Sequence, residues 1–287
     1  MEDFDFNITI VGLGLIGGSY AMALKDLNPK NIWAVDIDKN ALKTAQELGI
    51  IDQGYVDPEI PLKNSDIVIL CIYPNLAIEF IKEQMDHFKT GAIITDTAGI
   101  KEKLLSKING FVRTDIDFIG GHPMAGREYK GLSFASKDIF DGANYILTPI
   151  EQNKKENIQR IEYMIKGIGC KNIIKIDPKK HDEIIAFTSQ LPHIVAAALM
   201  NGAKEENTHL FVAGSFKDAT RVARMNTKLW SELLIENREN TIEQIERFEK
   251  YMTEIKNTII NNDQVTLEEL FENARGKREE FIEKCMK

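Results

Sequence analysis

The stretch ITIVGLGLIGGS, residues Ile8–Ser19, decides the fold. It opens with an apolar run rich in β-branched residues, which is typical of a strand buried on both faces. Glycines follow in the pattern G-x-G-x-x-G, ahead of a helix-compatible segment from Ser19 to Leu27. Such glycines permit a tight bend, a close approach of the backbone to a pyrophosphate, and close packing of helix on strand. The residues expected to bind a dinucleotide are Gly12, Gly14, Leu15, Ile16 and Gly17.

A carboxylate at position 36 strengthens this interpretation. A second apolar run, Ile32–Val35, ends directly before Asp36, which lies 19 residues after Gly17. An acid at this distance accepts hydrogen bonds from the hydroxyl groups of an adenosine ribose. No arginine follows it immediately, and a 2′-phosphate would be repelled, so the pattern favours NAD over NADP. A structural turn followed by an ordinary strand-end aspartate is the alternative. Two further candidate cofactor-binding residues end a later apolar run, Ile72 and Pro74.

The composition is that of a globular protein of 287 residues, with 43% hydrophobic and 28% charged residues. The net charge of -8 argues against a nucleic acid or a membrane surface as partner. Cys71, Cys170 and Cys285 form no C-x-x-C pair, which indicates reduced thiols, and we expect no metal site. The acidic N-terminus lacks an apolar signal core and no apolar run approaches ~18 residues, so a cytoplasmic location is expected.

Strand-like and helix-like segments alternate as far as Asp177. Runs that indicate further strands lie at residues 66–72, 92–96, 117–121, 144–148 and 171–176. Helical patterns lie at residues 40–48, 76–88, 101–108 and 151–168. This alternation predicts an α/β fold with a doubly wound, mostly parallel sheet in residues 1–177.

Residues 178–287 show only helical patterns. The expected helices cover residues 179–204 with a kink at Pro192, then 217–225, then one long helix over 227–261, and a last helix that opens at Thr266 with a capping-box pattern. We therefore expect an all-α domain. Because such an apolar helical domain commonly pairs with a copy of itself, we also expect a homodimer.

A histidine directly after an expected strand is the candidate general base. His122 follows the run 117–121, and the carboxyl ends of parallel strands meet at the edge where the glycine turn lies. Oxidising an alcohol requires a hydride acceptor and a base, and an imidazole with a pKa near ~6.5 suits the second role. The alternative is a structural histidine in a loop.

The helical part adds candidate substrate contacts. Asp182, Ser189 and His193 fall on one helical face, which indicates a cleft or, alternatively, a polar packing seam. Arg221 follows a glycine break and fits carboxylate binding, although a solvated helix face would look the same. Trp230 is either an aromatic wall or part of the core.

Four motifs resemble one family. They are GLGLIGGS at 12–19, HPMAG at 122–126, TSQLPH at 188–193 and GSFKDATRVA…LW at 214–230. Together they resemble the prephenate dehydrogenases of tyrosine biosynthesis, over nearly the whole chain. The resemblance implies an NAD-binding Rossmann domain, an all-helical dimerisation domain and an active site between them. It implies the oxidative decarboxylation of prephenate to 4-hydroxyphenylpyruvate and CO2.

The resemblance also implies roles for single residues. His122 would accept the proton of the ring hydroxyl as carbon 4 gives hydride to NAD. Arg221 would hold a substrate carboxylate, with His193 nearby and Trp230 bordering the pocket. The positions of a polar network that gates the site in the family are matched by Glu128 and Lys217.

The chain departs from the family pattern at two positions. Gly99 stands where many members have a serine, and Thr97 is the candidate to supply the missing hydroxyl to substrate. Gln190 stands where a histidine is common. Arogenate dehydrogenase, with the same fold and chemistry, is the nearest alternative function, and a non-catalytic NAD-binding metabolite sensor is the second.

Overall fold

The computed structural model describes residues 4–127, 129–203 and 207–286. The chain divides into two compact units, Met1–Asn237 and Arg238–Lys287. The first unit holds an eight-stranded sheet in the order β3-β2-β1-β4-β5-β6-β7-β8. The strands are β1 (Asn7–Val11), β2 (Asn31–Val35), β3 (Gln53–Tyr55), β4 (Ile67–Leu70), β5 (Ile93–Asp96), β6 (Asp117–Pro123), β7 (Asn144–Thr148) and β8 (Asn172–Lys175).

The sheet is parallel except at one pair of neighbours. β6 and β7 run antiparallel, whereas β7 and β8 are parallel again. The chain builds outward from β1 through β2 to β3 and then returns, so that β4 lies on the other side of β1. The order of strands therefore reverses between β1 and β4, which confirms the expected doubly wound, mostly parallel sheet.

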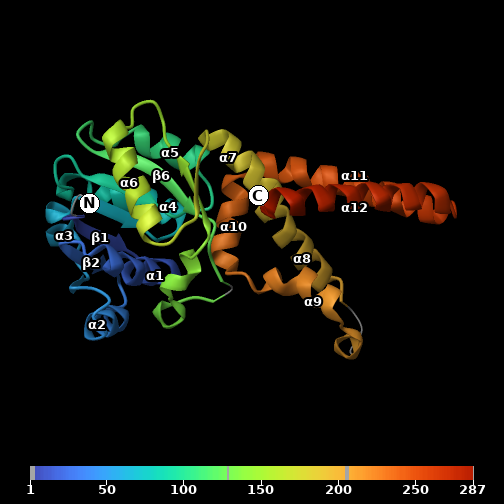
Figure 1. Ribbon diagram of the computed structural model, residues 1–287, viewed down its shortest axis with the longest axis horizontal. Coiled ribbons are helices and arrows are strands. Elements are labelled where there is room, and N and C mark those ends of the chain that lie inside the picture. The colour runs from blue at the N-terminus through green and yellow to red at the C-terminus, as the bar shows by residue number, and fades with distance from the viewer. Residues whose placement is uncertain (1–3, 128, 204–206, 287) are drawn as a thin grey trace. The chain divides into compact units, whose positions relative to one another are not determined.

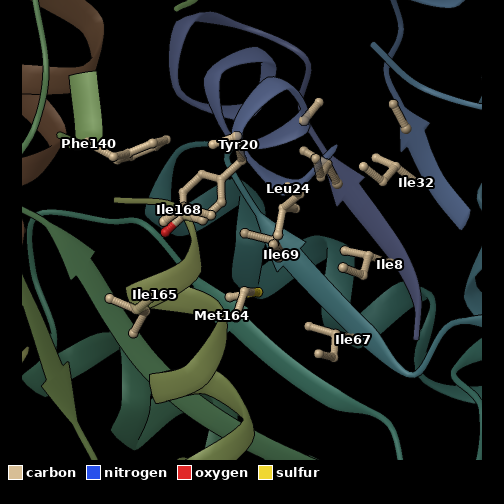
Figure 2. Packing of buried hydrophobic residues seen from close by; sticks show 14 of the residues in the cluster. Ile8, Tyr20, Leu24, Ile32, Ile67, Ile69, Phe140, Met164, Ile165 and Ile168 are labelled. Carbon is tan, nitrogen blue, oxygen red and sulfur yellow. The ribbon is translucent and has the colours of Figure 1, made fainter. Parts of the chain in front are cut away.

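Alternation along the central strands creates two hydrophobic layers. Ile67 and Ile69 of β4 are buried in one cluster, and Val68 and Leu70 in the other. The first cluster packs around Tyr20 and also includes Met164, Ile165 and Ile168, as Figure 2 shows. A strand whose successive residues are all buried needs a layer on each face, which explains why these runs are continuously apolar.

Helices connect and cover the strands. Those of the first unit are α1 (Leu15–Leu24), α2 (Lys39–Glu47), α3 (Glu59–Asn64), α4 (Pro74–Glu83), α5 (Glu102–Asn109), α6 (Lys155–Gly167), α7 (Pro178–Ile185), α8 (Leu191–Asn201), α9 (Gly214–Thr220) and α10 (Thr227–Glu236). The second unit consists of α11 (Arg238–Ile260) and α12 (Gln264–Met286), which lie side by side (Figure 1).

Several expected boundaries are wrong. α1 begins at Leu15 and not at Ser19, and its first turn includes Gly17, which lies against the carbonyl oxygen of Gly12 and the side chain of Ile10. The expected helix 227–261 is two helices with Asn237 between them. The last helix, α12, begins at Gln264 and not at Thr266. The N–H of Thr266 donates to the carboxylate of Asp263 at 3.1 Å, which caps the start of this helix.

The expected kinked helix over 179–204 is also interrupted. A π-helical turn, Ala186–Gln190, separates α7 from α8, and Pro192 lies in the first turn of α8. Because proline has no N–H, the turn before Pro192 lacks the hydrogen bond that another residue would donate at this position. Among the described residues, the continuous helical stretch Pro178–Asn201 is long and apolar enough to cross a membrane, with a mean hydropathy of 1.3.

Candidate functional site

A cavity of about 1060 Å³ opens beyond the carboxyl ends of β1 and β4, where the strand order reverses. Ligands of open parallel sheets bind at this position. Side chains of α8 and α10 line the cavity as well, so it lies between the sheet and the helices of the first unit. The sequence-predicted site residues that line it are Gly14, Leu15, Ile16, Ile72, Pro74, Thr97, His122, His193, Arg221 and Trp230.

The glycine-rich turn has one crowded side and one open side. Gly12 has a φ of +91°, and a Cβ there would lie 2.7 Å from the carbonyl oxygen of Cys71. A Cβ on Gly17 would overlap the carbonyl oxygen of Gly12. At Gly14, in contrast, a Cβ would meet no described atom within 4 Å. This open backbone and the N–H groups of the first turn of α1 fit a phosphate group.

Asp36 is held firmly at the end of β2, next to the glycine turn. One carboxylate oxygen accepts the N–H of Leu13 at 2.6 Å, and the other accepts the N–H of Asp38 at 2.8 Å. Two backbone donors fix the plane of the carboxylate. Its remaining acceptor capacity suits the hydroxyl groups of a ribose.

His122 lies inside a strand, and the expectation that it follows the strand is wrong. β6 continues to Pro123 because β7 pairs along it, with Ile146 opposite His122. Its Nδ1 lies 2.9 Å from Nε2 of His181. Burial, followed by charge repulsion from His181 and Lys101, lowers the pKa of His122 well below the ordinary value of 6.5. The ring is therefore neutral at neutral pH and able to accept a proton.

A buried ion pair lies behind His122. Lys101 is fully buried, and its ammonium group donates a hydrogen bond to Asp96. Burial lowers the pKa of Lys101, and the charge of Asp96 opposes that shift. The Asp96 carboxylate also accepts the N–H of Ala98 at 2.8 Å and that of Gly121 at 3.1 Å, which ties β5 to the strand that carries His122.

The helical wall of the cavity is formed by stacked rings. The rings of His193 and Trp230 lie 3.5 Å apart between centroids, with 23° between their planes. Nδ1 of His193 donates to the backbone carbonyl oxygen of Ser189, four residues earlier, at 2.8 Å, and this hydrogen bond orients the imidazole ring. Trp230 is therefore a wall of the cavity, as one of the two sequence readings held.

Four exposed cationic side chains are among the described residues that line the cavity. Arg221, in the turn after α9, lines it together with Arg127, Lys130 and Arg224. Lys217, also expected to contact substrate, lies on α9 with an exposed side chain and is not part of the lining of this cavity. Glu128 lies outside the described residues.

The two departures from the family pattern have clear surroundings. The hydroxyl of Thr97 donates to the carbonyl oxygen of Leu70 at 3.3 Å. A Cβ on Gly99 would lie 3.8 Å from Nε2 of His122, so this nitrogen faces the cavity that Gly99 lines. The amide oxygen of Gln190 accepts from Asn237 at 2.9 Å, within a buried polar group of the helical part.

The sequence patterns did not predict two residues of the site, His181, which contacts His122, and Tyr73, which lines the cavity. His181 is 1% exposed and bonds both His122 and Asp182. No apolar period marks it, because its partner His122 comes from a strand far along the chain. Tyr73 was also missed; its hydroxyl accepts from Asn226 at 2.7 Å, and both residues line the cavity.

Two family models match the chain in succession. The prephenate dehydrogenase nucleotide-binding domain matches residues 20–174, and the prephenate dehydrogenase dimerization domain matches residues 177–273. The chain belongs to the prephenate dehydrogenase family. This confirms the resemblance and the fold class, an α/β domain followed by helices.

Relatives and solved structures of this family resemble the chain over almost its whole length. A prephenate dehydrogenase of Lactococcus lactis subsp. cremoris is 35% identical over 95% of this chain and 76% of its own. The structure of prephenate dehydrogenase from A. aeolicus in complex with hydroxyphenyl propionate and NAD+ is 30% identical, has a TM-score of 0.88 and covers 96% of this chain and 98% of its own. Synechocystis arogenate dehydrogenase is 27% identical with a TM-score of 0.81, covering 96% and 99%.

Proposed function

We propose that this chain is an NAD-dependent prephenate dehydrogenase, which converts prephenate to 4-hydroxyphenylpyruvate and CO2. The observation that carries the proposal is one cavity lined by the open glycine of the turn, by His122 and by Arg221. These residues come from β1–α1, β6 and the turn after α9. A base, a carboxylate-binding cation and a dinucleotide site are the groups that this reaction requires.

The residues of the turn fit NAD. Gly14 leaves its backbone open, the start of α1 offers N–H groups for a pyrophosphate, and Asp36 stands ready for the ribose. Ile72 and Pro74 extend the same wall after β4. When NAD is bound, it supplies the acceptor for the hydride that leaves carbon 4 of the substrate.

His122 removes the proton in this reaction. Its Nε2 faces the cavity and takes the proton of the ring hydroxyl, while the bond to the ring carboxylate breaks and CO2 leaves. The electrons of that bond complete the aromatic ring, and the imidazolium of His122 then returns the proton to the phenolate oxygen, which gives the phenol of 4-hydroxyphenylpyruvate. The chain therefore mainly has to position the groups and hold one proton. A positioned base contributes roughly 10²–10⁴-fold to such a step.

The charge of the cavity supports prephenate over arogenate. Prephenate and arogenate both carry two carboxylates, and they differ in the side chain, where prephenate has a keto group and arogenate has an ammonium group. Among the described residues that line the cavity, four are cationic and none is a carboxylate, and the cations are Arg127, Lys130, Arg221 and Arg224. We assign Arg221 to a substrate carboxylate, with His193 and Trp230 bordering the ring. Thr97, Lys217 and Glu128 stay proposals from the family pattern.

Steady-state kinetics test the function. The purified chain is given NAD with prephenate or arogenate, and the absorbance of NADH is followed. We expect turnover with prephenate to dominate; a preference for arogenate would assign the chain to the other activity, and NAD binding without turnover of either would indicate a sensor. His122→Asn should keep NAD binding and lower kcat by about 10²–10⁴-fold. His87→Asn is the matched control, because in the described part of the chain the ring of His87 bonds to Gln84, three residues before it, at 2.9 Å.

We further propose a division of labour along the chain. Residues 1–177 bind the cofactor, and the helical residues 178–287 complete the substrate site and form a homodimer in the cytoplasm. The dimerization-domain match supports this, as do the exposed side chains of Phe187, Met200 and Phe211. The apolar stretch Pro178–Asn201 then faces a second copy and not a lipid bilayer. Light scattering should give twice the mass of the chain, and fractionation should leave it out of the membrane pellet.

A further inference from the structure

Three side chains form a hydrogen-bonded row that leads away from the cavity. Nδ1 of His122 lies 2.9 Å from Nε2 of His181, and Nδ1 of His181 lies 2.7 Å from a carboxylate oxygen of Asp182. The two imidazole planes are 68° apart, so the rings meet edge to face and not in a stack. His181 and Asp182 are buried, so this row is closed to solvent at its inner end.

Asp182 is held at the start of α5 by backbone donors. One of its oxygens accepts the N–H of Lys101 at 2.8 Å, and the other accepts the N–H of Glu102 at 2.9 Å. These peptide groups can only donate. Both oxygens of the carboxylate therefore act as acceptors toward this helix N-terminus. Asp182 is thus an acceptor for His181.

The direction of each hydrogen bond in the row follows from this end. Since Asp182 accepts, Nδ1 of His181 carries a proton. The Nε2 of a neutral His181 is then an acceptor, so Nδ1 of His122 must donate to it. A neutral imidazole holds one proton, and with that proton on Nδ1 the Nε2 of His122 has its lone pair toward the cavity. The helix N-terminus therefore decides which nitrogen of His122 is the base.

We propose that His181 and Asp182 are positioning residues that hold His122 in the tautomer whose Nε2 accepts the substrate proton. The inference rests on the proposed function, since it concerns the base of that reaction. When Nε2 takes the proton from the hydroxyl oxygen, His122 becomes an imidazolium ion that keeps its Nδ1–H bond to His181. The anion at Asp182, one ring further on, polarises that bond and stabilises the new charge.

Because residue 99 is a glycine, the hydrogen bond between His181 and His122 becomes more important for orienting the His122 ring. A hydroxyl at residue 99 would stand on the cavity side of His122, where a Cβ would lie 3.8 Å from Nε2. Glycine provides none, and the hydroxyl of Thr97 is used by Leu70. Among the described residues, the ring of His122 is oriented by the hydrogen bond between its Nδ1 and Nε2 of His181.

Two substitutions at one position separate positioning from packing. His181→Phe keeps a ring of similar size but removes the acceptor, whereas His181→Gln keeps an amide oxygen that can accept from Nδ1 of His122. We expect His181→Phe to lower kcat about 100-fold, with KM and NAD affinity changed less than about 3-fold. His181→Gln should recover at least about 10-fold of the lost kcat. If the role were only packing, Phe would be as active as Gln or more so, and that result would overturn the proposal.

A pair of matched aspartates tests the other end of the row. Asp182→Asn replaces an acceptor-only group by one that can donate to His181 and thereby reverse the row, so kcat should fall at least about 10-fold. Asp177→Asn is the control, because the Asp177 carboxylate also caps a helix start, accepting the N–H of Lys179 at 2.9 Å, while its described contacts include no bond to an imidazole ring. The backbone carbonyl of Asp177, which accepts the N–H of His181, is unchanged in this variant. An equal fall in kcat for both variants would contradict the proposal. Should Asp182→Asn not fold, the pair at position 181 decides alone.

The tautomer itself can be read without turnover. In ¹⁵N-histidine-labelled protein, which has five histidines, ring-nitrogen NMR shifts distinguish protonated from unprotonated nitrogens. We expect His122 with the proton on Nδ1 in the wild type and a loss of this preference in His181→Phe. A proton on Nε2 in the wild type would refute the inference even in an active enzyme. Failure of the proposed function would appear separately, as absent turnover with the tautomer intact.

Discussion

Gly17→Ala would place a methyl group where the first turn of α1 meets the glycine loop. The added Cβ would overlap the carbonyl oxygen of Gly12 and lie 3.1 Å from Cγ2 of Ile10. Both neighbours belong to buried backbone or core, so neither can move away freely. Overpacking of this kind costs about 1–3 kcal/mol, and the upper end applies where backbone is met. About 3 kcal/mol corresponds to a melting temperature lower by about 6–12 °C for a domain of this size.

Gly14→Ala is the matched control within the same motif. Its Cβ would meet no described atom within 4 Å, so the free energy of unfolding without ligand should stay within about 0.5 kcal/mol of the wild type. The methyl group instead occupies the face that a pyrophosphate approaches, so NAD should bind at least about 10-fold more weakly. Thermal melts with and without NAD, together with calorimetric titration, measure both effects. A Gly17→Ala melt superimposable on the wild type would refute the packing argument, and unchanged NAD affinity in Gly14→Ala would refute the placement of the phosphate.

Three further outcomes are expected. Arg221→Ala should raise the KM for prephenate at least about 10-fold and leave NAD affinity unchanged, because a charge-assisted hydrogen bond is lost; an unchanged KM removes Arg221 from the pocket. Because the pKa of His122 is lowered, kcat/KM should stay high at and above pH 6.5 and should fall only at lower pH, as the pH passes through the shifted pKa. A pH profile of kcat/KM that is half-maximal above pH 6.5 would argue against His122 as the base. Lys101→Met leaves Asp96 buried without its cation and should lower the free energy of unfolding by about 3–5 kcal/mol in urea titrations, whereas a loss below 1 kcal/mol would mean that the pair is dispensable.

The elements that the sequence predicts well are those with a strong local signal. The buried strands β1 and β4 are largely apolar runs, and the turn after β1 has three glycines at fixed spacing, Gly12, Gly14 and Gly17. β3 and α3 were missed, because Gln53–Tyr55 has no apolar run and joins the sheet only at its edge, beside β2. The place of β3 in the sheet comes from its pairing with β2, which lies about twenty residues earlier in the chain.

Tertiary partners explain the remaining errors. The helix expected over 227–261 is interrupted at Asn237, whose side-chain amide donates to the carbonyl oxygen of Asp182 and to Gln190. Nothing in the period of apolar residues around Asn237 reports on those partners. His122 could be found from its place after an apolar run, but the pairing that draws it into β6, and the histidine behind it, come from distant segments.

The π-helical turn Ala186–Gln190 has a geometric consequence for the wall of the cavity. A π turn closes around one residue more than an α turn, and each residue of a helix advances by about 100° around the axis. The direction in which the His193 side chain points around the helix axis is therefore set by the number of residues before it and not by their identity. Shortening this turn by one residue would swing His193, and every later side chain of α8, around the axis without altering any of them chemically.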